Sequence, residues 1–288
     1  MKGAMDIFLL EAVINGLLLG GVFALLALGL NLIFGVIDVV WIAYTELMMV
    51  GMYAMFWLYA KYHWPFLAAA ASAIAVVAVL GLLTHFLIIG PILDAPPINQ
   101  LLATGGLLFF LQSVATLLFS TEFRNIGIRL PTLEVAGMFI SVARLLAFGV
   151  SLIGVACLYA FLRRTYWGVA IRAIAQDRQI IGLMGIDQRW VYGITSAVGG
   201  ALAGLAGCLL VLQYDVHPFI GLSFGPILFM ICVLGGLGNM LGGLVAAFIV
   251  SEIIAVSGFY VSTDLSYVLA FMVFIGLMFW RPRGMFTR

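Results

Sequence analysis

Long apolar runs, broken only by short polar stretches, cover almost the whole chain. A helix needs about 20 apolar residues to cross the roughly 30 Å hydrocarbon core of a membrane, whereas a membrane β-barrel shows short segments of alternating polarity. The run LEAVINGLLLGGVFALLALGLNLIFGV near the start is long, apolar and without alternation. The pattern predicts an all-α integral membrane protein with apolar blocks at 7–34, 38–60, 65–90, 98–120, 137–162, 190–213, 221–236, 239–257 and 264–281.

The last third of the chain contains an apolar stretch, 221–257, that is too long for one crossing. As a single helix it would measure about 55 Å at a rise of about 1.5 Å per residue. Its middle, GGLGNMLGG, permits a tight turn because glycine adopts backbone conformations that other residues avoid. We therefore expect a polytopic helical bundle of about eight transmembrane helices plus a split or re-entrant segment near 221–257. The candidate hinge or turn residues are Gly235, Gly236, Gly238, Gly242 and Gly243.

Composition excludes several classes of protein. Only 9% of the 288 residues are charged and 65% are hydrophobic, with a mean hydropathy of +1.23, whereas roughly a quarter of a soluble domain is charged. The net charge of +1 leaves no basic surface for nucleic acid. Neither Lys2 nor Lys61 lies in a phosphate-binding GxxxxGK[ST] loop, and the histidines and cysteines lack metal-ligand spacing. We expect no catalytic residue, no metal site and no cofactor bound by this chain, and we do not expect it to be an enzyme.

The arginines indicate how the chain is oriented in the membrane. Five of them lie in the stretch 163–189, and three more lie in the C-terminal stretch 281–288. Because positively charged loops stay in the cytoplasm, both stretches are predicted to be cytoplasmic, with an even number of crossings between them. Splitting 221–257 into two passes provides that even number. Counting membrane crossings back from the cytoplasmic stretch 163–189 places the polar break at 120–134 and the N-terminus outside the cell.

A few ionisable and amide side chains lie inside the apolar runs, where they are expensive and usually face a bundle interior or a polar path. Glu46 and Glu252 lie within spans, whereas Glu11 is near the start of the first helix and is expected to be interfacial. The alternative is that such groups only form hydrogen bonds between helices. The candidates for a translocation path are Asn31, Tyr44, Glu46, Gln112 and Glu252.

The segment RTYWGVAIRAIAQDRQIIGLMGID, at 164–187, closely resembles the cytoplasmic coupling segment of the permeases of branched-chain (hydrophobic) amino-acid ABC importers. Runs near the start, at 100–119 and at 221–252 also resemble this family, so the resemblance covers nearly the whole chain. Of the two permease subunits in such importers, the chain is more similar to the shorter, LivH-type one. The matching motif positions are Gly168, Arg172, Ala173, Ala175, Gln176, Asp177, Leu183, Gly185 and Ile186.

One block departs from the family. After the first long helix the family usually has a sequence close to INFAHGELFMLGAY, whereas this chain has VWIAYTELMMVGMY. Glu46 is retained, but Trp41, Ile42, Tyr44 and Thr45 stand where asparagine, phenylalanine, histidine and glycine are usual. If this block lines the path, branched-chain specificity is open, and related permeases for urea, amides or small carboxylates are alternatives.

The resemblance implies a single transmembrane permease domain over 1–288 in a bacterial inner (plasma) membrane, surrounded by lipid. It implies a second permease subunit that is a different but related chain, two ATPase subunits that bind ATP and Mg²⁺, and a periplasmic substrate-binding protein. The cytoplasmic coupling segment, 164–188, would transmit ATPase movements during alternating access; it is compatible with a helix over 170–181. The residues implied in ATPase coupling are Gly168, Arg172, Ala175, Asp177, Arg178 and Gly185.

Two other functions stay open at this point. The chain could be a secondary transporter or channel working without ATPases, although no span carries the charge pairs typical of a proton or sodium relay. It could also be a membrane scaffold that transports nothing. Transport by the purified chain alone would favour the first, and the lack of an ATPase partner on co-purification would favour the second.

Overall fold

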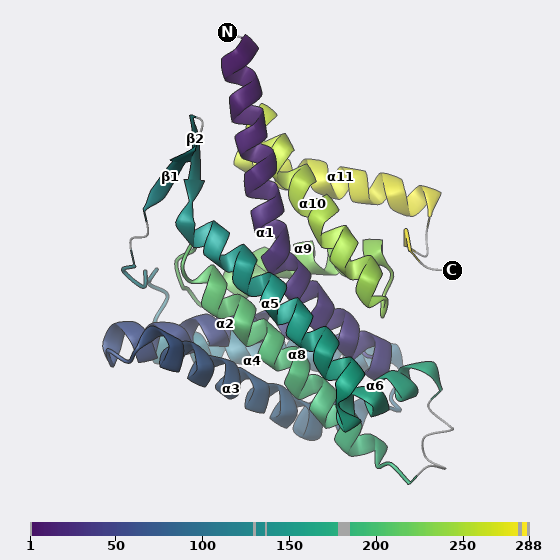
Figure 1. The fold of residues 1–288 in the computed structure, drawn as a ribbon. Coiled ribbons are helices and arrows are strands. Elements are labelled where there is room, and N and C mark those ends of the chain that lie inside the picture. The colour runs from purple at the N-terminus through teal and green to yellow at the C-terminus, as the bar shows by residue number, and fades with distance from the viewer. Residues whose placement is uncertain (1, 129–130, 136, 178–184, 282–283, 287–288) are drawn as a thin grey trace.

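The computed structural model describes residues 2–128, 131–135, 137–177, 185–281 and 284–286. Helices account for most of them (Figure 1). In chain order, the elements are α1 (Lys2–Ile37), α2 (Tyr44–Phe56), α3 (Phe66–Thr84), α4 (Pro97–Phe119), β1 (Thr132–Val135), β2 (Met138–Ser141), α5 (Val142–Arg164), α6 (Tyr166–Gln176), α8 (Gln188–Leu210), α9 (Ile220–Gly235), α10 (Met240–Tyr260) and α11 (Thr263–Trp280).

The helical prediction is confirmed. Among the described residues, six helices are long and apolar enough to cross a membrane: α1, α3 with the turns that extend it to Ile92, α4, α5, α8 and α10. The helices α9 and α11 are shorter apolar elements, and α2 is lengthened by a π-helical turn at Trp57–Lys61. Together they form a polytopic bundle.

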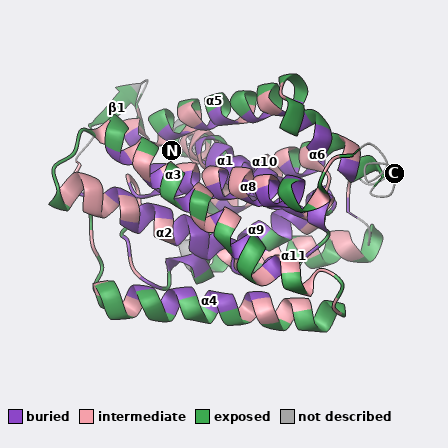
Figure 2. Cartoon of the chain, turned by 90° about the horizontal axis from the view of Figure 1, so that it is seen from below, coloured by how far each residue is buried: buried purple, intermediate pink, exposed green. Residues whose placement is uncertain are grey.

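Helices α1 and α8 form the centre of the bundle. Most of the apolar part of α1 is buried, and α1 packs on α10, α8 and α5 (Figure 2). Helices α3 and α8 lie so close together that their backbones are in contact. A Cβ atom on Gly81 would lie 2.5 Å from the carbonyl oxygen of Ser196, and one on Gly200 would lie 2.6 Å from that of Val77. Small residues thus allow the close helix packing that stabilises bundles in lipid.

The expected split of the long apolar block is confirmed. Helix α9 ends at Gly235, and α10 begins after Asn239, whose side chain accepts a hydrogen bond from the backbone N–H of Gly242 at 3.0 Å. Between them, Gly236 and Gly238 have positive φ angles of 91° and 80°, which favour glycine. The segment 221–257 therefore forms two helices joined by a tight turn.

The two stretches predicted to be cytoplasmic lie at the same end of the bundle, which we call the α6 end. There, Gly35 near the end of α1 contacts Gly238, and the backbone N–H of Met285 donates to the carbonyl of Leu234 at 2.8 Å. The N-terminus of α1 lies at the opposite end (Figure 1). This arrangement agrees with the predicted even number of crossings between the two stretches.

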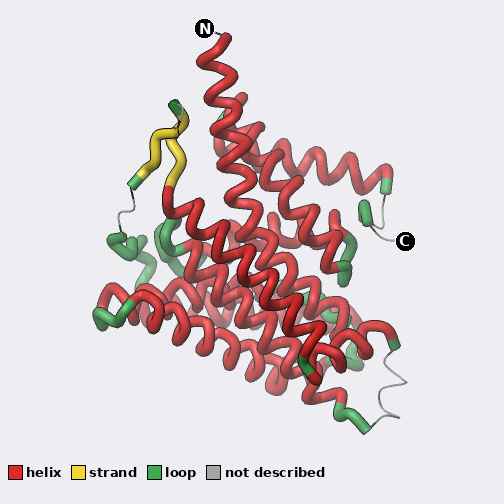
Figure 3. The backbone as a smooth tube through the Cα atoms, in the orientation of Figure 1, coloured by secondary structure: helices red, strands yellow, loops and turns green. Residues whose placement is uncertain are grey.

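A β-hairpin at the N-terminal end of α1 was not expected from the sequence. Strands β1 and β2 pair antiparallel, with Thr132 opposite Ser141 and Val135 opposite Met138, and they lie beside the N-terminal part of α1 (Figure 3). Glu11 of α1 accepts a hydrogen bond from the backbone N–H of Phe139 at 3.3 Å. The apolar block predicted at 137–162 was therefore wrong in its first residues, because a four-residue strand is too short to show its period within an apolar run. We call this end of the bundle the hairpin end.

Candidate functional site

Glu46 and Gln112 form a hydrogen-bonded pair inside the bundle. Glu46 is in the first turn of α2 and Gln112 is in α4, and both side chains are buried. The amide nitrogen of Gln112 donates to Oε1 of Glu46 at 2.9 Å. Atom Oε2 of Glu46 is buried and has no hydrogen-bond partner among the described residues. The structure thus brings together two of the five residues predicted for a translocation path. One carboxylate oxygen of Glu46 has no hydrogen-bond partner among the described residues.

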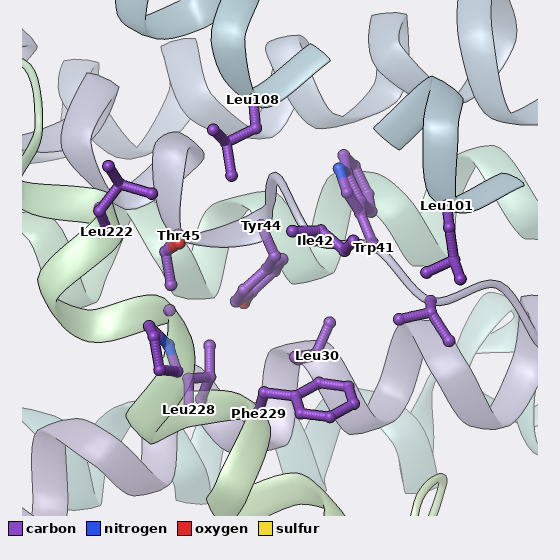
Figure 4. Close-up of a pocket in the computed structure, with 14 residues that line it drawn as sticks. Leu30, Trp41, Ile42, Tyr44, Thr45, Leu101, Leu108, Leu222, Leu228 and Phe229 are labelled. Carbon is purple, nitrogen blue, oxygen red and sulfur yellow. The ribbon is translucent and has the colours of Figure 1, made fainter. Parts of the chain in front are cut away.

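Beside this pair is a cavity of about 330 Å³ between α1, α2, α4 and α9, which we call the apolar cavity (Figure 4). Its walls are almost entirely hydrocarbon, and the hydroxyl of Thr45 is among its few polar groups. The hydroxyl of Tyr44 is occupied, because it donates to the carbonyl of Gly199 at 2.9 Å. The lining residues are Leu30, Val40, Trp41, Ile42, Tyr44, Thr45, Leu101, Leu108, Gly221, Leu222, Gly225, Pro226, Leu228 and Phe229.

All four positions at which the chain departs from the family motif line the apolar cavity: Trp41, Ile42, Tyr44 and Thr45. Figure 4 shows Tyr44 near the centre, between Leu108 of α4 and Leu228 and Phe229 of α9. Trp41 is fully buried, and its indole N–H has no hydrogen-bond partner among the described residues. The unusual block therefore contributes to the shape and the polarity of this cavity.

The other two residues predicted for the path lie elsewhere. Asn31 is buried near the turn between α9 and α10, where its Oδ1 accepts from the backbone N–H of Gly238 at 3.1 Å and its amide nitrogen packs against Gly243. Glu252, on α10, faces Gly16 of α1. Neither lines the apolar cavity. The hydrogen bond of Asn31 agrees with the alternative of hydrogen-bonded packing, whereas Glu252 only packs close to α1.

Sequence reasoning missed the contribution of α9 and of the apolar residues of α4. Leu101 and Leu108, and five residues of α9 between 221 and 229 besides a proline, line the cavity with ordinary apolar side chains or glycines. Nothing in their type separates them from lipid-facing residues. The one available signal was Pro226, because a proline inside a helix removes a backbone hydrogen bond.

The predicted coupling segment forms a short surface helix, α6, at the α6 end of the bundle. Thr165 caps it, because its hydroxyl accepts from the backbone N–H of Gly168 at 3.0 Å. Ile171 and Ile174 are buried against the bundle, whereas Arg172 is exposed. One apolar face of α6 thus packs against the bundle, and the opposite face is exposed.

Helix α6 overlaps the range 170–181 that the sequence showed to be compatible with a helix. It begins at Tyr166 and ends at Gln176, and residues 178–181 lie outside the described residues. The Thr165 cap explains the early start, and Asp177 has an extended backbone with φ −154° and ψ 114°. Ala175 and Asp177 are exposed, and Gly185 lies in the turn before α8 with φ 74°. Arg178, also predicted for coupling, lies outside the described residues.

Gly168 holds α6 against α5 by its lack of a side chain. A Cβ atom there would collide with the carbonyl oxygen of Phe161 and lie 2.6 Å from the Cα of Leu162. Both are backbone atoms of α5, so no side-chain rotation would relieve the contact. Gly168 therefore positions the helix that carries Arg172, and it is itself buried.

These features define a class of protein: a multi-pass membrane protein with an apolar cavity between its helices and a surface helix at one end. The family model described as "Branched-chain amino acid transport system / permease component" matches residues 12–278. The chain therefore belongs to the family of branched-chain amino acid transport permeases.

Two curated relatives match this chain over nearly its full length, and a third matches part of it. The chain is 28% identical over 301 residues to the high-affinity branched-chain amino acid transport system permease protein LivH of Escherichia coli, covering 98% of this chain and 96% of the relative. It is 28% identical over 294 residues to BraD of Pseudomonas aeruginosa, covering 97% and 96%. A probable LivH of Methanocaldococcus jannaschii is 32% identical over 93 residues, covering 32% and 30%. No solved structure gave a significant match.

Proposed function

We propose that this chain is a permease subunit of an ATP-driven importer, in which it forms a translocation path with a second, related permease subunit. The proposal is supported chiefly by α6, a capped surface helix that exposes Arg172 and is followed directly by the exposed Asp177. Such charges pair well across a protein interface. The chain itself lacks an ATP-binding loop, so the helix is assigned to contact an ATPase subunit that binds ATP and Mg²⁺.

In this proposal the membrane is the bacterial inner membrane. The α6 end faces the cytoplasm, where the positively charged stretch 163–189 belongs by the positive-inside rule. The hairpin end faces the periplasm and receives the substrate-binding protein. ATP binding and hydrolysis in the two ATPases would move α6, and α6 would move the helices α5, α1 and α8 on which it packs. The path would then open alternately to the two sides.

The substrate assigned is a small molecule with an apolar body, of which branched-chain and other hydrophobic amino acids are the leading examples. The named relatives support amino acids. The hydrocarbon lining of the apolar cavity also supports an apolar body over urea or short amides, which lose hydrogen bonds to water without replacement in such a lining. We assign the preference among hydrophobic substrates to this cavity and to the binding protein. The cavity differs from that expected for the family at four lining residues: Trp41, Ile42, Tyr44 and Thr45.

The test of this function reverses a charge on the exposed side of α6. Arg172→Glu and, separately, Asp177→Arg are expected to prevent co-purification of the ATPase subunits and to reduce ATP-dependent uptake to background, while the chain still inserts into membranes. The physical reason is that each variant places like charges at the interface. The control is Glu134→Lys, which reverses an exposed charge of β1 at the hairpin end and should leave co-purification of the ATPase subunits unchanged. Normal uptake by both α6 variants would contradict the assignment.

A further inference from the structure

A second cavity lies on the other side of α9 from the apolar cavity. It has a volume of about 550 Å³, and we call it the vestibule. It lies at the hairpin end, where the backbones of Arg124 and Val216 pair and where Asn125 donates to the carboxylate of Asp215 at 2.8 Å. Its lining residues are Phe123, Tyr214, Asp215, His217, Ile220, Ser223, Phe224, Pro226, Ile227, Tyr267 and Phe271.

Helix α9 is the wall between the two cavities, because its opposite faces line them separately. Leu222, Gly225 and Phe229 recur at helical spacing and line the apolar cavity, as do Gly221 and Leu228. Positions 220, 223, 224 and 227 form the opposite face and line the vestibule. Pro226 touches both spaces. Leu222 and Phe229 are 46% and 45% exposed, so the apolar cavity also opens to the surface of the chain. Within the chain, the direct route from one cavity to the other leads through this helix.

The first turns of α9 contain residues that weaken a helix. Pro226 has no backbone N–H, so the carbonyl of Leu222, four residues earlier, receives no helical hydrogen bond from it. Gly221 and Gly225 have no side chains to pack. Helices bend or break most readily at such positions. The wall is therefore weakest where it separates the two cavities.

The same turns cover the Glu46 carboxylate. A Cβ atom on Gly221 would collide with both carboxylate oxygens of Glu46, so only backbone separates the carboxylate from the apolar cavity that Gly221 lines. Displacing the start of α9 would uncover a buried carboxylate oxygen that now lacks a partner among the described residues. The start of α9 and Glu46 are therefore mechanically linked.

We propose that 220–226 of α9 is the gate of the translocation path, that the vestibule is the site at which substrate enters from the hairpin end, and that the apolar cavity is the next compartment. The proposal rests on the importer function proposed above. The vestibule suits a small molecule with an amino group and an apolar body. Asp215 supplies a negative charge, Tyr214, Ser223 and Tyr267 supply hydroxyls, and Phe224 and Phe271 supply apolar surface.

The imidazole of His217 adds a polar group to the vestibule. Burial lowers the pKa of His217 below its usual 6.5, and the negative charge of Asp215 only partly offsets this effect. This shift disfavours the charged form of the imidazole, which would repel an amino group. Its ring lies 4.6 Å from the ring of Phe123, measured between centroids.

Two neighbouring positions on α9 provide the test. In the assembled importer, reconstituted in proteoliposomes with Cys157→Ser, Cys208→Ala and Cys232→Ala, single cysteines are introduced as Ser223→Cys, in the vestibule, and Leu222→Cys, in the apolar cavity. A membrane-impermeant cationic methanethiosulfonate reagent is added from the hairpin side. Without nucleotide, Ser223→Cys is expected to react at least about tenfold faster than Leu222→Cys. Trapping the ATPases with ATP and vanadate is expected to raise the rate at Leu222→Cys about tenfold.

The control is Leu117→Cys on α4, whose side chain is 85% exposed on an apolar helix and should stay unreactive in lipid. Equal rates at Leu222→Cys and Ser223→Cys without nucleotide would overturn the proposal, since the two spaces would then be one. An unchanged rate at Leu222→Cys in an importer that traps vanadate would also overturn it. A chain that assembles with no ATPase would instead contradict the importer function, so the two failures are distinguishable.

A second variant tests the weak point of the wall. Pro226→Ala restores a backbone hydrogen bond and is expected to stiffen α9, because a proline inside a helix removes one such bond and clashes with the preceding turn. Trapping with ATP and vanadate should then raise the labelling rate at Leu222→Cys by a factor several times smaller than in the parent importer. Assembly of the importer should be unchanged. A full rise in the Pro226→Ala background would show that α9 does not bend there and would contradict the gate.

Discussion

Uptake by the Glu46→Ala variant is expected to fall about tenfold or more, which corresponds to about 1.4 kcal/mol in a rate-limiting barrier. The substitution removes the acceptor for the buried amide of Gln112, and an unpaired buried donor costs about 1–3 kcal/mol. It also leaves a space against Gly221 at the start of α9. The measurement is uptake of radiolabelled L-leucine per assembled importer in proteoliposomes.

Two further variants show whether this loss of uptake is specific to Glu46 and whether it comes from destabilisation of the chain. Glu11→Ala is the control: Glu11 is at the hairpin end and accepts one long hydrogen bond, from Phe139 at 3.3 Å, so little effect is expected. Glu46→Gln keeps the size of the side chain and an oxygen that accepts from Gln112, so its thermal unfolding should match that of the parent chain. Equal and negligible effects of Glu46→Ala and Glu11→Ala would return Glu46 to a packing role.

The second large effect is expected for Gly168→Ala. Its Cβ atom would collide with the α5 backbone at Phe161 and Leu162 and would force α6 away from the bundle. Overpacking of this kind costs about 1–3 kcal/mol, and it displaces the surface that carries Arg172. We expect ATPase activity to become independent of the substrate-binding protein and uptake to fall to background, measured on the same proteoliposomes.

A glycine of α5 provides the matched control for this substitution. Gly149 has no atom within 4 Å of the position that a Cβ would occupy. Gly149→Ala is therefore expected to leave both ATPase coupling and uptake unchanged, or to stabilise α5 slightly, because alanine favours helix over glycine. If Gly149→Ala and Gly168→Ala behaved alike, the position of α6 on α5 would not determine coupling.

The sequence predicted the helices and their order because apolar length is a direct consequence of membrane thickness. It also predicted the turn between α9 and α10, because Gly236 and Gly238 mark a change of backbone conformation. The β-hairpin was missed because four-residue strands next to an apolar helix have no visible period. The exact bounds of α6 were not predicted, because its start depends on one cap, Thr165, and its end on the extended backbone of Asp177.

The site was predictable only where polar groups interrupt the apolar runs. Glu46, Gln112 and Tyr44 were selected for that reason, and the structure places them at or beside the apolar cavity. The same signal selected Asn31, whose partner is a backbone N–H of a glycine turn, which no residue-level pattern reveals. The α9 face was missed because its glycines and apolar residues resemble lipid-facing ones. Only three-dimensional packing shows that α9 divides two cavities.

The most direct test of the account is ATP dependence of uptake in proteoliposomes. Vesicles contain the chain alone or the chain with its second permease and ATPase subunits, with the substrate-binding protein outside and a panel of labelled L-leucine, L-isoleucine, L-valine and L-phenylalanine as probes. The proposed importer function predicts uptake only by the complete importer, only with ATP and Mg²⁺ inside, and at background level when the chain carries Arg172→Glu. Uptake by the chain alone, unchanged by ATP, would contradict this function.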